Sequence, residues 1–73
     1  MNLTQYQLVA DALLRTKGLT LPIFVLDADE AGKSAHSISR ELYEATDGAV
    51  DVTSQAVRNW IGQFRAAETA GAA

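Results

Sequence analysis

Three polar side chains near the carboxyl end of the sequence recur at helical spacing, namely Gln55, Arg58 and Asn59. On a helix, residues three and four positions apart share one face. Glutamine and asparagine can each form two hydrogen bonds with adenine, and arginine can do the same with guanine. The spacing therefore predicts a helix face suited to base edges in the major groove of DNA, with Ser54 at its start.

The same segment carries an apolar stripe on its other side. The residues of this stripe follow the spacing of a buried helix face and are Val57, Trp60, Ile61 and Phe64. Thr53 is suited to cap the helix, which we expect over residues 54–66. No acidic residue lies between Thr53 and Ala67, whereas Arg58 and Arg65 flank the polar face. The local charge is thus opposite to that of the whole chain.

Gly62 lies on the polar side of this expected helix. A glycine inside a helix costs about 1 kcal/mol relative to alanine. One interpretation is close approach of another backbone, of protein or of nucleic acid, to this position. The other is close packing between helices, or a destabilisation that the fold tolerates.

Two stretches partly match known ligand loops, and both matches fail. Residues 31–34 read Ala-Gly-Lys-Ser, like the end of a phosphate-binding loop, but the first glycine of that motif would fall at Asp27. Residues 27–32 open like a calcium loop, but its position 12 is Ile38 instead of a glutamate. We expect neither a nucleotide site nor a metal site, and interpret Gly32 as a helix stop and Ser34 as the cap of the next helix.

His36 is the single histidine, and the chain has no cysteine. Helical periodicity places His36 on an outer face beside Arg40, with no nucleophile and base brought together. We interpret His36 as a surface residue, with a phosphate contact as the alternative. The sequence therefore predicts no enzyme, no cofactor and no small-molecule substrate.

Length and composition indicate one folded domain. The chain has 73 residues, of which 48% are hydrophobic and 21% are charged. Neither a long apolar run nor a basic segment followed by an apolar run is present, so we expect no membrane span, no signal peptide and a cytoplasmic location. The net charge of −3 argues against a general nucleic-acid coat, although a local patch can differ from the average.

Helix signals divide the first two thirds of the chain. Thr4 and Gln7 form a capping-box pattern and Gly18 is a stop signal, which predicts a helix over residues 5–17. The next segment, 21–31, contains an apolar run that fits a strand or a buried helix.

Thr20 and Pro22 decide this second segment in favour of a helix, because proline suits a first helical turn and weakens a strand. Ser34 begins a third helix over residues 35–46, which Thr46-Asp47-Gly48 ends.

We expect an all-α fold, a compact four-helix domain over residues 1–66 followed by a flexible tail over 67–73. The core shared by the four helices is expected to comprise Tyr6, Leu13, Ile23, Leu26, Ile38, Leu42, Val57, Trp60 and Phe64. Leu8 and Ala12 fall outside the main apolar face of the first helix. They indicate either a central position for that helix or a second contact surface, such as one for another copy of the chain.

Three elements between residues 34 and 64 form a further pattern: Ser-Ile-Ser-Arg-Glu-Leu at 37–42, Thr-Asp-Gly at 46–48, and Val-Thr-Ser-Gln-Ala-Val-Arg-Asn-Trp-Ile at 52–61. The pattern resembles helix-turn-helix DNA-binding proteins, notably small ones encoded by actinobacterial phages and prophages. The resemblance implies a helix-turn-helix over residues 34–66 and a role in transcription regulation. It also implies that the residues after the second cap read bases, here Ser54, Gln55, Arg58 and Asn59.

The resulting hypothesis is a regulator that inserts its last helix in the major groove of double-stranded DNA, with Lys33, Arg40 and Arg65 on phosphates. So few cations predict weak binding by a monomer, and useful specificity would need a homodimer. The alternative is a small acidic helical module that binds a host or phage protein. Two observations support this alternative: the net charge of −3 and the surplus apolar surface of the first two helices.

Overall fold

The computed structural model describes the backbone of residues 3–72 and the side chains of residues 4–68. That part of the chain forms four α-helices and no strand, which confirms the expected all-α fold. The helices are α1 (Leu3–Arg15), α2 (Leu21–Glu30), α3 (Ala35–Ala45) and α4 (Ser54–Ala72).

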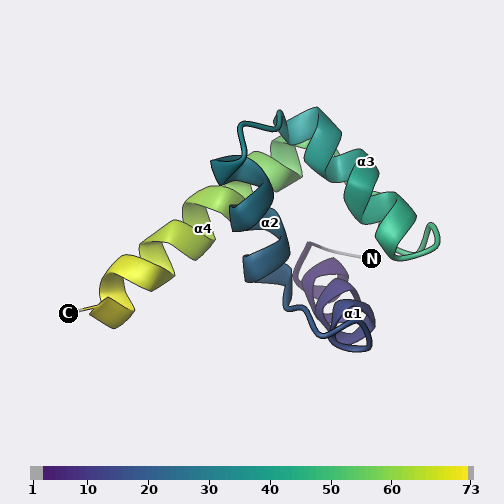
Figure 1. Ribbon diagram of the computed structural model, residues 1–73, viewed down its shortest axis with the longest axis horizontal. Coiled ribbons are helices and arrows are strands. Elements are labelled where there is room, and N and C mark those ends of the chain that lie inside the picture. Colours follow the sequence, from purple (N-terminus) through teal and green to yellow (C-terminus); the bar gives the residue numbers. More distant parts are fainter. Residues whose placement is uncertain (1–2, 73) are drawn as a thin grey trace.

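The first half of α4 lies against α2 and α3, and α1 lies on the other side of α2 (Figure 1). α2 and α3 both pack against α4, and α2 also contacts α1 and α3. The second half of α4 projects away from this assembly (Figure 1). The segment expected to read DNA therefore belongs to the packed part of the molecule.

α2 is a helix, as Pro22 predicts, and Pro22 occupies its first turn. Thr20 caps it, because its side-chain oxygen accepts a hydrogen bond from the backbone N–H of Ile23 at 3.3 Å. Leu21, Val25 and Leu26 are buried. The continuous apolar run thus belongs to a central helix that contacts all three others.

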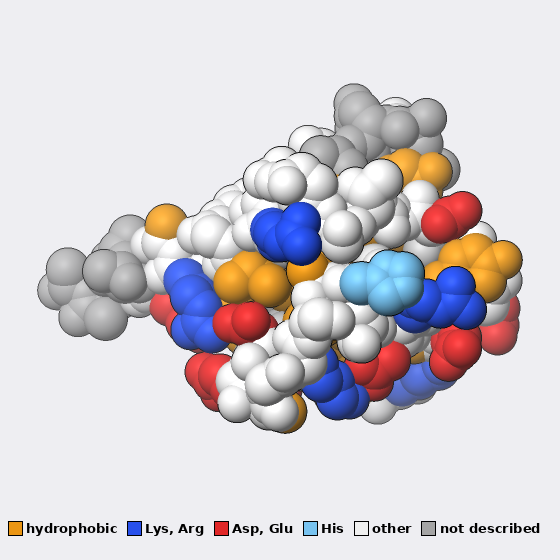
Figure 2. Space-filling view, turned by 90° about the horizontal axis from the view of Figure 1, so that it is seen from above, with side chains coloured by type: hydrophobic (Ala, Val, Ile, Leu, Met, Phe, Trp, Pro, Cys, Tyr) orange, Lys and Arg blue, Asp and Glu red, His pale blue; other side chains and the backbone are white. Residues whose placement is uncertain are grey.

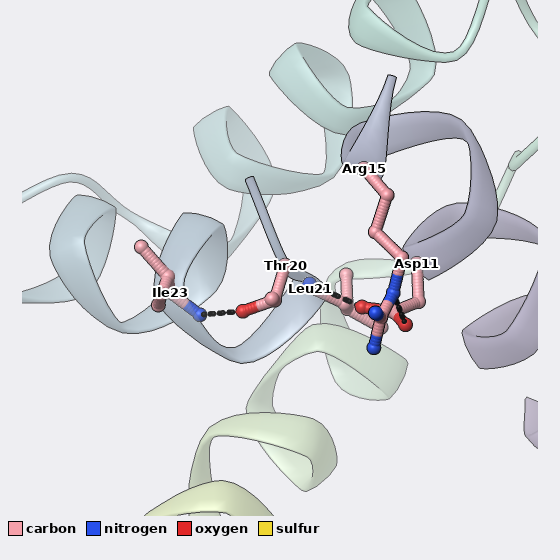
Figure 3. Close-up of polar contacts among 5 residues, drawn as sticks. All are labelled: Asp11, Arg15, Thr20, Leu21 and Ile23. Atoms are coloured by element: carbon pink, nitrogen blue, oxygen red, sulfur yellow. Dashed lines mark hydrogen bonds and ion pairs between the residues drawn. The ribbon is translucent and has the colours of Figure 1, made fainter. Parts of the chain in front are cut away.

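Asp11 joins α1 to the start of α2 (Figure 3). One of its carboxylate oxygens accepts a hydrogen bond from Arg15 Nε at 2.7 Å, and the other accepts from the backbone N–H of Leu21 at 3.0 Å. The hydrogen bond from Arg15, and then that from Leu21, hold the pKa of Asp11 below its usual value against the opposing effect of desolvation. One carboxylate therefore restrains the Thr16–Thr20 connection.

Ser34 and Thr53 cap the last two helices as expected. Ser34 Oγ accepts from the N–H of Ser37 and Thr53 Oγ1 from the N–H of Ala56, each at 3.1 Å. The expected cap at Thr4 is wrong, because α1 already begins at Leu3 and the backbone at Thr4 is helical. A capping residue needs extended backbone, so Thr4 cannot serve.

Gly18 and Gly32 end α1 and α2 in the same way. Both have positive φ, +78° and +85°, which glycine adopts without a Cβ penalty. At the first, the N–H of Leu19 donates to the Leu14 carbonyl at 3.0 Å, and at the second, the N–H of Lys33 donates to the Ala28 carbonyl at 3.2 Å. Both glycines therefore close Schellman motifs, and α1 ends at Arg15, earlier than the expected residue 17.

The core combines residues from all four helices and from the connection before α4. Its fully buried members are Ala10, Leu14, Leu21, Val25, Ile38, Leu42, Val50, Val57 and Trp60. Ile38, Leu42, Val57 and Trp60 confirm the expected core, Leu26 is buried beside it, and Tyr6 and Phe64 pack against it half-buried.

Two expected core positions differ in the structure. Ile23 is 49% exposed, because it lies about 200° around the helix from both Leu21 and Val25, which face inward. In α1, Leu14 is fully buried with Ala10 one turn before it, and Leu13 is only half-buried. The buried stripe of α1 is thus rotated from the face that periodicity favours.

α4 continues to Ala72 instead of ending near Ala66. Alanine has the highest helix propensity of all residues, and the segment after Ala66 is rich in it. α4 therefore includes residues 67–72 of the segment expected as a tail, and Ala73 lies outside the described residues.

Thr46 anchors the connection between α3 and α4. Its buried hydroxyl donates to the Leu42 carbonyl at 2.8 Å and accepts from the backbone N–H of Val50 at 3.1 Å. Asp47 follows in a left-handed conformation with φ of 53°. Because Val50 is itself in the core, these contacts hold the connection against α3 and set where α4 begins.

Candidate nucleic-acid interface

The outward face of α4 begins at Ser54 and carries Gln55, Arg58 and Asn59 as exposed side chains. It faces outward because Ala56, Val57 and Trp60 occupy the buried side of the same turns. Gln55 Nε2 donates a hydrogen bond to Asn59 Oδ1 at 3.1 Å, so the two amides lie one turn apart on one face. The structure therefore brings Gln55 and Asn59 together as the spacing predicts.

Arg58 lies on this face without an ion pair to any other described residue. No acidic residue occurs in the sequence between Thr53 and Ala67, so its neighbours along the helix add no negative charge. A guanidinium in this state keeps all its N–H donors available for a base edge or a phosphate.

α3 contributes a second set of polar side chains beside the start of α4. An open groove runs between α3 and the residues that lead into α4. Its α3 wall consists of His36, Ser39, Arg40 and Tyr43, and its other wall of Asp51, Val52, Thr53 and Ser54. On this face the histidine lies next to a basic side chain, and acidic side chains lie close to this pair (Figure 2).

Arg40 and His36 lie one turn apart on α3, and both are exposed as expected. Arg40 makes no ion pair within the described part of the chain. Like Arg58, it therefore has a guanidinium with no carboxylate partner, which can bind a phosphate. Arg40 and Ser54 of α4 line the same groove.

Arg65 is engaged elsewhere. Its Nη2 lies 2.6 Å from Asp29 Oδ2, and its Nη1 lies 4.0 Å from Glu30 Oε1. The hydrogen bond to Asp29 raises the pKa of Arg65 above its usual value. The structure thus joins Arg65 to the end of α2, and a phosphate would have to compete with two carboxylates for it.

Lys33 is also paired. Its Nζ donates to Glu41 Oε1 at 2.7 Å, and both side chains remain exposed. Of the four basic residues that we consider for DNA contacts, the structure leaves Arg40 and Arg58 unpaired among the described residues and pairs Lys33 and Arg65 with acids.

Gly62 has open space beside it. A Cβ built at this position meets no described atom within 4 Å apart from its own helix and chain neighbours. Close packing between helices therefore does not explain the glycine, which leaves a tolerated destabilisation or the approach of a molecule from outside.

Tyr43 and Asp51 belong to the groove but are not among the expected site residues. Tyr43 is 47% exposed and follows His36 and Arg40 at helical spacing, so periodicity could have assigned it to the same face. Asp51 lies two residues before the cap Thr53, and the folding of the connection against α3 brings it into the groove.

The described residues contain no group of three or more histidine, cysteine or acidic side chains placed to hold a metal ion. Over the same residues, none of the helices has the length and apolar character needed to cross a bilayer.

Comparisons with protein-family models, with curated proteins and with solved structures found no match to this chain.

Proposed function

We propose that this chain binds double-stranded DNA by placing the first half of α4 in the major groove, as the recognition helix of a helix-turn-helix over residues 34–66. Gln55, Arg58 and Asn59 face the base edges, and Arg40 contacts the phosphate backbone. The observation that carries the proposal is the outward face of the first half of α4: exposed amides and an unpaired arginine, with no acidic residue between Thr53 and Ala67.

The biological role in this proposal is transcription regulation in a phage setting, as the resemblance of residues 34–64 implies. Two unpaired arginines give a single copy little electrostatic hold on DNA. A homodimer on a two-fold site doubles the contacts. Leu8, which is 68% exposed on α1, and Ile23 on α2 offer apolar surface for it.

The test is a salt titration of binding to a random-sequence duplex, followed by fluorescence anisotropy from about 50 to 200 mM salt. The variants are Arg58→Ala and, as a charge-matched control, Arg15→Ala on α1. On a random-sequence duplex no base pair is matched to Arg58, so its guanidinium contacts phosphate. Arg58→Ala is therefore expected to weaken binding and to reduce the slope of log affinity against log salt by about 0.9, the value for one lost phosphate contact. Arg15→Ala should leave both close to wild type.

Equal effects of the two substitutions would point to a general charge effect and not to α4. Absence of binding at low salt, by protein whose helicity is intact by circular dichroism, would refute the proposal.

A protein-binding module is the second candidate, and the exposed apolar side chains of α1 and α2 favour it. Leu8 lines a groove with Pro22 of α2 and Phe64 of α4, on a chain whose net charge is −3. Exposed apolar surface bordered by polar residues is typical of protein contact sites. If folded protein fails to bind DNA at low salt, this candidate becomes the preferred one.

A further inference from the structure

The groove between α3 and residues 51–54 contains a titratable side chain that the proposed function does not use. His36 and Arg40 are exposed and lie one turn apart on the α3 wall, with Tyr43 further along. Asp51 is the one acidic residue lining the opposite wall, beside the polar side chains of Thr53 and Ser54. These are the charged and titratable groups that face His36.

Neither His36 nor Arg40 is engaged with the fold. Within the described part of the chain, neither side chain takes part in an ion pair or a side-chain hydrogen bond. When the imidazole is protonated, two cations lie one turn apart and repel each other. An anion held between them would interact favourably with both and would receive charge-assisted hydrogen bonds from both.

We propose that DNA binding by this chain is linked to protonation: the groove takes a phosphodiester of the DNA backbone, and protonated His36 strengthens that contact together with Arg40. The inference rests on the proposed DNA binding. The groove adjoins Ser54, the first residue of α4, so the phosphate that it takes is one that flanks the bases facing Gln55 and Arg58.

The direction of the pH effect follows from the charges. A bound phosphate favours the cationic form of the imidazole, so the complex takes up a proton on formation. DNA affinity therefore rises as the pH falls through the range from about 8 to 5, in which histidine changes its charge. The chain has one histidine and no cysteine, so a proton-linked change in this range is readily assigned.

The experiment compares wild type with His36→Gln on a random-sequence duplex, near pH 7.5 and near pH 5.5, by fluorescence anisotropy at several salt concentrations. Wild type is expected to bind about threefold to fivefold more tightly at the lower pH, the range of an exposed ion pair. Its salt slope should steepen by about 0.9, for one added phosphate contact. His36→Gln should show the same affinity and the same slope at both pH values.

Two controls separate the inference from the proposed function. Circular dichroism at both pH values establishes that the helices persist, and Arg58→Ala should bind more weakly at both while keeping the ratio between them. If wild type binds equally at the two pH values, or His36→Gln keeps the change, the proton-linked contact is wrong and DNA binding by α4 stands. If wild type binds no duplex at low salt at either pH, both are wrong.

Discussion

At the scale of single residues, five of the six basic side chains fall into two groups, and the sixth, Lys17, donates a hydrogen bond to the Ala45 carbonyl at 2.8 Å. Arg15, Lys33 and Arg65 each lie within 2.7 Å of a carboxylate oxygen. Arg40 and Arg58 have no such partner among the described residues. Exposed ion pairs of the first kind contribute at most about 1 kcal/mol to stability, but they reduce the charge available to a phosphate. The positive charge of the candidate interface therefore comes from two arginines, in a chain whose net charge is −3.

Asp11 gives a pH-dependent prediction at the same scale. Because its pKa is lowered in the folded state, its ionised form contributes stability above the unfolded pKa of about 3.9, and this is lost as the pH falls through the folded pKa. Asp11→Asn should be less stable than wild type near neutral pH, by at most about 1 kcal/mol since the pair is exposed.

The two proteins should converge in stability as the pH falls below the lowered pKa of Asp11. Urea unfolding can be followed by the emission of Trp60, the single tryptophan, which is buried. An equal difference at neutral and acid pH would contradict the assignment to Asp11.

At the scale of the elements, two kinds of contact decide where helices begin and end. Ser34, Thr53 and the glycines at 18 and 32 act through bonds to residues a few positions away. Thr46 also acts locally, but the connection that it holds includes Val50, which lies in the core. The start of α4 is therefore set by both local and tertiary contacts.

Thr46→Val tests this anchor. The substitution keeps the shape of the side chain but leaves the buried N–H of Val50 without its acceptor, which should lower the free energy of unfolding by about 1–3 kcal/mol. Thr46→Ser retains the hydroxyl and should be closer to wild type. Urea unfolding measures both, and a Thr46→Val protein as stable as wild type would show that the hydroxyl is dispensable.

Alanine substitutions at Gly62 and Gly32 test the backbone conformation of two glycines that differ in φ. Gly62→Ala should stabilise the fold by up to about 1 kcal/mol, because the site is helical and open. Gly32→Ala should destabilise it by about 1 kcal/mol or more, because its φ is +85°. Thermal unfolding by circular dichroism compares them, and a shift of the same sign in both would contradict the difference in backbone conformation.

At the scale of the whole molecule, the arrangement separates two surfaces. The outward face of α4 and the groove on α3 carry polar and basic groups, whereas α1 and α2 expose Leu8 and Ile23. The two could serve a DNA contact and a contact with a second copy without competing for the same residues.

Leu8→Glu tests the proposed homodimer. Because Leu8 is 68% exposed, its replacement should leave the fold intact, and a charge at a two-fold contact should dissociate the dimer. Sedimentation equilibrium is expected to show dimers for wild type and monomers for Leu8→Glu, with Thr16→Glu as a charge-matched control that remains dimeric. A wild-type protein that is monomeric at every concentration would remove the homodimer from the proposal.

Sequence reasoning predicts the four helices, three of their N-caps, their glycine stops and the polar and apolar faces of α4. These features depend on hydrogen bonds and backbone angles within a few residues, so residue types alone specify them. Tertiary packing is what makes Val25 and Leu14 face the core in place of Ile23 and Leu13. It also decided that Arg65 pairs with Asp29, 36 residues away, and that residues 51–54 form a groove with α3. Such contacts join segments far apart in the chain, and helical periodicity carries no information about which neighbour each face will meet.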